Sequence, residues 1–110
     1  MSDHSTQISG HRDQQVGGSD TLAVGTDLSL SIGRNRVETV GRSSLLTVGK
    51  QLRVEAADEI ALVVGAASIV LKKDGSITIR GKNIDLIGSG KINVKASSDL
   101  TLKGSKIVDN

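Results

Sequence analysis

The sequence contains no phenylalanine, tryptophan or tyrosine, although a globular domain of 110 residues normally fills its core with several aromatic rings. It contains no proline either, so no position is barred from a β-ladder for want of a backbone N–H. Together these absences predict a narrow interior lined by Val, Ile and Leu, as in a thin stack of β-strands.

Other absences limit the class of protein. Without cysteine there is no disulfide framework, and the compartment is left open. No apolar run approaches the roughly 18 residues that span a bilayer. The first 20 residues are polar, so no secretory signal is expected. Export would need a route that does not depend on an N-terminal signal. The net charge is only +2 and base-stacking aromatics are missing, which argues against nucleic-acid binding.

A short repeat is the main positive signal. An apolar residue followed by glycine recurs every eight residues, and the pair is replaced once, at Ala56-Ala57. Eight is a multiple of two, so an extended chain presents the same face in every repeat, whereas a helix would drift by about 80°. The pairs are Val16-Gly17, Val24-Gly25, Ile32-Gly33, Val40-Gly41, Val48-Gly49 and Val64-Gly65.

Hydrophobic alternation fills each repeat. Between residues 22 and 64, 14 of 22 even positions hold Val, Ile, Leu or Ala, against six of 21 odd positions. This pattern is typical of β-strands with one buried face, and glycine is expected at the corners because it tolerates the angles of a tight bend. Arg36, Glu38 and Ser44 interrupt the even positions. They predict either a local slip or a polar ring inside the stack that holds an ion or water.

The parity changes after Val64, and apolar-x-apolar units then start at intervals of eight or seven residues. We expect about twelve short strands in all, no helix, and two regions: a flexible lead-in over residues 1–15 and an octad-repeat needle over 16–110. Polar corners are expected at Lys73-Asp74-Gly75, Gly81-Lys82-Asn83, Gly88-Ser89-Gly90, Ser97-Ser98-Asp99 and Lys103-Gly104-Ser105.

A single strand cannot bury its own face, so the repeats need a way to close. A monomeric solenoid would make only about four triangular coils and leave two raw sheet edges without caps. Three copies wound around one axis bury a continuous core. The sequence therefore predicts an all-β fold, a triple-stranded intertwined β-helix or triangular prism formed by a homotrimer. Its expected lumen residues are Val24, Leu30, Ile32, Val48, Val54, Leu62, Val64, Ile79, Leu86, Val94 and Leu102.

The octads, together with residues 66–79 and 98–107, resemble the C-terminal needle of VgrG proteins, the trimeric spikes of type VI secretion systems. Contractile phage tail spikes carry a related needle. The resemblance covers about residues 13–110, but only Val16-Gly17-Gly18 keeps both glycines often found in the family. The globular N-terminal parts of the family are missing from this sequence, so we expect a needle fragment or a separately made needle.

The resemblance implies a mechanical, non-enzymatic part of an injection machine. It implies assembly in the cytoplasm, a tail tube or spike body at the N-terminal end, a PAAR-repeat tip protein or effector at the C-terminal end, and transient passage through a target membrane. Ile107 and Val108 are the expected tip-docking residues. Alternatives are a trimeric stalk of a phage fibre or adhesin, and a monomeric solenoid that acts as a scaffold or carbohydrate-active enzyme.

No catalytic, cofactor-binding or metal-binding site is predicted. His4 and His11 lie in the lead-in, and Asp58 and Glu59, as neighbours in a strand, would point to opposite faces. Lys73-Asp74-Gly75 is interpreted as a turn, because the spacing of calcium-binding loops is missing. The basic cluster is interpreted as a solvated outer face; it consists of Arg34, Arg36, Arg42, Lys50 and Arg53.

Overall fold

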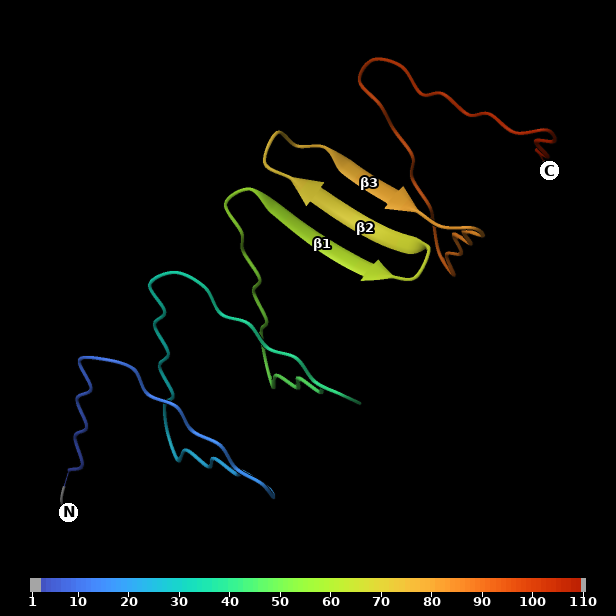
Figure 1. Ribbon diagram of the computed structural model, residues 1–110. Coiled ribbons are helices and arrows are strands. Elements are labelled where there is room, and N and C mark those ends of the chain that lie inside the picture. The colour runs from blue at the N-terminus through green and yellow to red at the C-terminus, as the bar shows by residue number, and fades with distance from the viewer. Residues whose placement is uncertain (1–2, 110) are drawn as a thin grey trace. The chain divides into compact units, whose positions relative to one another are not determined.

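The regular secondary structure in the computed structural model, which describes residues 3–109, is entirely β. Strands β1 (Glu59–Val64), β2 (Ala67–Lys72) and β3 (Ile77–Arg80) form one antiparallel sheet in the order β1-β2-β3 (Figure 1). Residues 3–109 include no helix that is long and apolar enough to cross a membrane. The chain divides into two units, Met1–Leu46 and Thr47–Asn110, and the sheet belongs to the second.

A two-residue loop joins β1 to β2. Val64 lies opposite Ala67, so only Gly65 and Ala66 make the reversal. Gly65 has a φ of +53°, while Ala66 does not have a positive φ. A positive φ at the first loop residue alone is the signature of a type II′ turn, which takes glycine there and matches the twist of a hairpin.

The loop between β2 and β3 is built around Asp74 and Gly75. The Gly75 N–H donates a hydrogen bond to the Lys72 carbonyl at 3.1 Å, and the Ser76 N–H donates one to Asp74 Oδ1 at 3.0 Å. Gly75 has a φ of +94°, the left-handed region that favours glycine. This is a β-turn followed by a left-handed glycine, a common closure for a hairpin. The prediction of a turn at Lys73-Asp74-Gly75 is confirmed.

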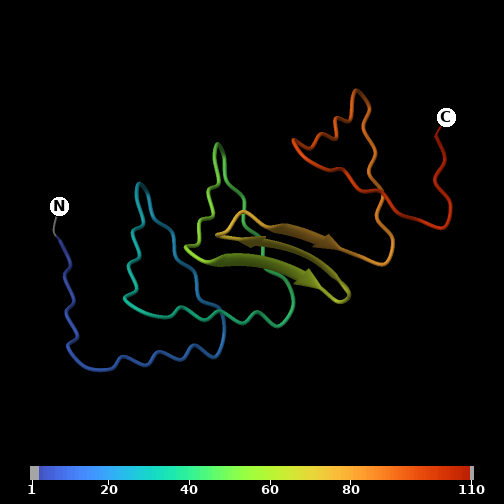
Figure 2. The same ribbon diagram turned by 90° about the horizontal axis from the view of Figure 1, so that it is seen from above.

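Outside the sheet the chain runs as extended segments separated by bends (Figure 2). The bends from Gly17 onward fall where the sequence predicts corners, including Ala57, which stands in a slot that elsewhere holds glycine, whereas the bend at Ser9–Gly10 lies in the predicted lead-in. They lie at Ser9–Gly10, Gly17–Gly18, Gly25–Thr26, Gly33–Arg34, Gly41–Arg42, Gly49–Lys50, Ala57–Asp58, Lys82–Asn83, Ser89–Gly90, Ser97–Ser98 and Ser105.

The prediction that these corners hold glycine for its backbone angles is wrong. None of the octad glycines between residues 17 and 49 has a positive φ, and a Cβ placed on any of them would meet nothing within 4 Å. Nothing within the single chain therefore demands glycine in these slots. Only Gly65 and Gly75 need it for their backbone angles.

The single chain has no buried core. No residue among 3–109 is buried, and the accessible surface is 12423 Å². A folded monomer of 11.4 kDa is expected to expose roughly 5,800 Å². An all-β chain that leaves this much apolar surface in water needs partner chains to fold stably.

From the sequence we did not expect part of the chain to pair with itself. Over residues 59–80 the chain reverses twice and pairs with itself, so three successive strands lie side by side in one sheet. The winding of three copies around a common axis stays a prediction.

Candidate assembly surface

One face of the sheet is apolar throughout. In the antiparallel register Leu62 lies opposite Ile69, which in turn lies opposite Ile79. Directly opposed residues in neighbouring strands point to the same face, and alternation along each strand extends that face. Its members are Ile60, Leu62, Val64, Ala67, Ile69, Leu71, Ile77 and Ile79.

The register explains why the hydrophobic parity changes along the chain. Because the tight turn pairs Val64 with Ala67, an even position of β1 shares a face with an odd position of β2. The longer loop pairs Leu71 with Ile77 and leaves the parity odd. The switch seen in the sequence after Val64 is therefore a hairpin reversal that keeps one face apolar.

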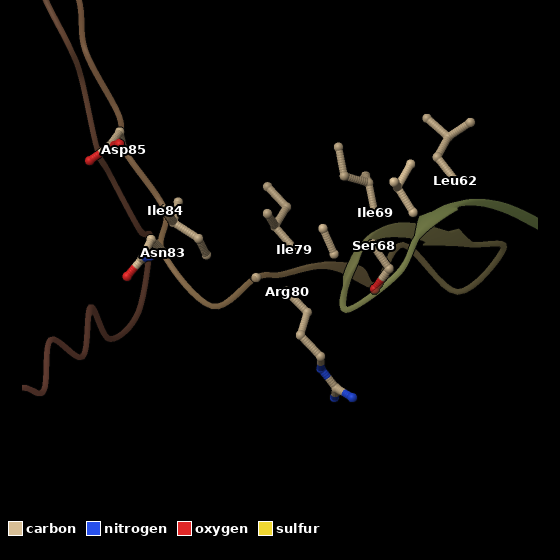
Figure 3. Close-up of a pocket in the computed structure, with 11 residues that line it drawn as sticks. Leu62, Ser68, Ile69, Ile79, Arg80, Asn83, Ile84 and Asp85 are labelled. Atoms are coloured by element: carbon tan, nitrogen blue, oxygen red, sulfur yellow. The ribbon is translucent and has the colours of Figure 1, made fainter.

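A shallow hollow of about 400 Å³ lies on this face and continues into the segment after β3. Figure 3 shows Leu62, Ile69 and Ile79 pointing to one side of the sheet, while Arg80 points to the other. Ile84 also lines the hollow. The lining is mainly aliphatic, so the hollow suits packing against another apolar surface better than binding a polar ligand.

Charged side chains lie opposite one another on the paired strands. Glu59 lies opposite Lys72, and Lys73 Nζ lies 3.6 Å from Asp58 Oδ1. The Lys73 N–H also donates to the Asp58 carbonyl at 3.0 Å, which extends the ladder by one pair. Each of the two neighbouring acids thus faces a lysine rather than the other acid, an arrangement that supports pairing of strands.

Two members of the basic cluster form ion pairs. Arg36 Nη2 lies 2.7 Å from Glu38 Oε2, and Arg53 Nη2 lies 2.9 Å from Glu55 Oε2. Each pair joins residues two apart, which share one side of an extended chain. The other members of the cluster, Arg34, Arg42 and Lys50, each occupy the second position of a bend.

The β2–β3 turn carries a carboxylate whose charge supports the turn. The pKa of Asp74 is held below the ordinary value of 3.8, mainly by the hydrogen bond from the backbone N–H of Ser76 and, to a smaller extent, by the hydrogen bond with the Ser76 side chain. A depressed folded-state pKa contributes stability that is present above the unfolded value and lost as the pH falls through the folded one.

We therefore expect Asp74→Asn to be less stable than the unaltered protein at neutral pH, and the difference to shrink on acidification below 3.8. Asparagine keeps a side-chain acceptor but has no charge to titrate. Melting midpoints of both proteins across that range give the measurement. A difference that stays constant with pH would show that the Asp74 charge does not support the turn.

The predicted lumen residues are all solvent-exposed in the single chain, from 43% for Val48 to 81% for Val64. Leu62, Val64 and Ile79 lie together on the apolar face of the sheet. The other eight lie in extended segments outside it. Their inward orientation stays a prediction, because it depends on chains that surround them.

The remaining candidates are not part of the sheet. Ile107 and Val108 are 56% and 74% exposed, and follow the bend at Ser105. Tip docking at these residues stays a prediction. His4 Nε2 lies 3.0 Å from Thr6 Oγ1. Within residues 3–109 no group of three or more His, Asp or Glu side chains is placed to hold a metal ion.

A stretch of 35 residues is 63% identical to the type VI secretion system spike protein VgrG1b of Pseudomonas aeruginosa. The chain contains a VgrG-related segment. The match covers 32% of this chain and 5% of VgrG1b, so the matched stretch is a small part of that spike protein. No protein-family description matches the chain.

Proposed function

We propose that this chain is a structural needle segment of a contractile injection spike, in which three copies wind around one axis as a triangular prism. The observation that carries the proposal is the exposed surface of the single chain, 12423 Å². Three chains folded together are expected to expose roughly 13,000 Å² in total. Assembly would therefore bury most of what each copy exposes alone.

The distribution of backbone hydrogen bonds favours partner chains over a single-chain solenoid. Among residues 3–109, every backbone-to-backbone hydrogen bond lies between Asp58 and Arg80. A solenoid would pair each strand with a later strand of its own chain. Extended segments without such pairing have backbone N–H and C=O groups that can bond to neighbouring chains. Three intertwined copies would provide hydrogen-bond partners on both edges of each segment.

The octad glycines support the same assembly. Their slots are open within the single chain, and their backbone angles do not require glycine. Glycine in a strand or bend also serves where another backbone approaches closely. A neighbouring copy that crosses each corner gives a reason for glycine that the isolated chain lacks.

The relation to VgrG1b supports a structural rather than an enzymatic role in a type VI secretion spike. A closed prism has no lateral sheet edge and resists bending, as a part that pierces a membrane must. Its N-terminal end would continue into the spike body and tail tube. Its C-terminal end, with Ile107 and Val108, would dock a PAAR-repeat tip protein or an effector. Such a needle would assemble in the cytoplasm and leave the cell with the injection machine.

The solution mass tests this proposal. Light scattering after size exclusion is expected to give three times 11.4 kDa. A single-chain mass would contradict the prism and, with it, the needle.

A further inference from the structure

Arg36 and Glu38 form an ion pair that is placed unusually for a surface pair. The Nη2 and Oε2 atoms are 2.7 Å apart, and the two side chains are 62% and 55% exposed in the single chain. Residues two apart on an extended chain point the same way, so both charges lie on one side of this segment.

That side is the one on which most even-numbered positions of the neighbouring octads are apolar. The pair lies between the bends at Gly33–Arg34 and Gly41–Arg42. The corresponding slots hold Leu28 and Leu30 one octad earlier, and Ser44 and Leu46 one octad later. Alternation therefore directs the ion pair toward the axis of the proposed prism, as a charged layer among mainly apolar ones.

We propose that three Arg36–Glu38 pairs, one from each copy, form an interior layer that fixes the register of the three chains. This inference rests on the trimeric needle proposed above. Octads that share one alternating pattern leave a repeated chain prone to slip by eight residues, because most apolar positions then still meet apolar positions. In a slipped chain, the Arg36–Glu38 pair would lie in the same layer as Leu28 and Leu30 of its neighbours. The ion pairs of the other two copies would then lie in a different layer.

The energetics favour such a device. A buried ion pair adds little stability over a well-packed apolar layer, yet removing one partner leaves an uncompensated buried charge at high cost. A single polar layer in a coiled coil specifies register by the same principle. A layer of this kind therefore lowers the stability of the aligned trimer little, but it strongly lowers the stability of a trimer in which one chain has slipped.

Arg53 and Glu55 provide a matched control. Their Nη2 and Oε2 atoms are 2.9 Å apart, and the two residues are likewise separated by one position, but they occupy odd positions. Leu52 and Val54 hold the even positions beside them. This second pair is expected on the outer surface, where an exposed ion pair contributes little.

The first test compares single substitutions. Arg36→Leu and Glu38→Leu should each lower the melting midpoint of the trimer, on the order of 10 °C, because three unpaired charges remain inside. Arg53→Leu and Glu55→Leu should change it by only about 1 °C. If the substitutions at both pairs changed the melting midpoint equally, and the unaltered protein had the mass of three chains, the register layer would be overturned while the proposed needle would not. A single-chain mass for the unaltered protein would overturn the needle itself.

The second test reads the register directly. The chain has no cysteine, so Ser44→Cys introduces one thiol per copy, one octad beyond Arg36 in the same slot. Aligned copies bring these thiols into one layer, and mild oxidation should link two chains. In the Arg36→Leu/Glu38→Leu background the trimer should keep its melting midpoint while the linked fraction falls by at least half. An unchanged linked fraction would show that the ion pair does not set the register.

Discussion

Replacement of Leu62 with Asp is expected to abolish assembly of the three-chain needle. Leu62 lies in the middle of β1 on the apolar face, opposite Ile69, and is 60% exposed in the single chain. In the proposed prism this face would be covered, and three like charges would gather near the axis. Burying ionised carboxylates without partners costs several kcal/mol each. Light scattering should then give 11.4 kDa or aggregate, not three times that mass.

Val63→Asp is the matched control for this experiment. Val63 is the next residue of β1, it is 66% exposed, and it lies opposite Ser68 on the other face of the sheet. A charge there stays in water in the proposed prism, so the trimer mass should be retained. If Leu62→Asp assembled as well as Val63→Asp, the apolar face would not be the one that packs inward.

The sequence alone predicts the local path of the chain well. Period-two alternation and the eight-residue spacing set out the extended segments and the bends that separate them, and even Ala57 bends where glycine is missing. The antiparallel register places three of the predicted lumen residues, Leu62, Val64 and Ile79, on one face of the sheet, while their inward orientation stays a prediction. These features are local, so they can be read from neighbouring residues.

Pairing between strands is not a local property, and there the sequence interpretation missed the sheet. An alternating segment looks the same whether its partner lies in its own chain or in another. A signal was nevertheless present. Gly65-Ala66 separates two apolar runs by two residues, and the parity switches across it, as a hairpin requires. The Lys73-Asp74-Gly75 turn marks the second reversal.

The octad glycines show a second limit. The sequence suggested that a bend requires glycine for its angles, yet the backbone at Gly25 or Gly41 does not enter the left-handed region. In the proposed prism, a neighbouring copy that approaches these corners closely would give the physical reason for glycine. Such a contact lies between chains, so the structure of one chain does not reveal it.

The repeat itself makes the last strong prediction. An extra alanine inserted between Leu28 and Ser29 should disrupt assembly, because one added residue turns every following side chain of that segment to the opposite face. Duplication of the whole octad from Gly25 to Ile32 should instead be tolerated. It restores the phase after one more bend and lengthens the prism by about one strand spacing, 4.8 Å.

Melting midpoints and solution masses of the two variants measure this difference. The one-residue insertion should lose the three-chain mass, and the octad duplication should keep it with a midpoint equal to or above that of the unaltered chain. An added residue within the bend at Lys82–Asn83 is a useful control, since the units on either side already vary between seven and eight residues. If an insertion in the strand were tolerated as well as one in the bend, alternation would not set which face packs inward. Tolerance of whole octads alone would instead show that the needle is specified by phase, with its length free to vary.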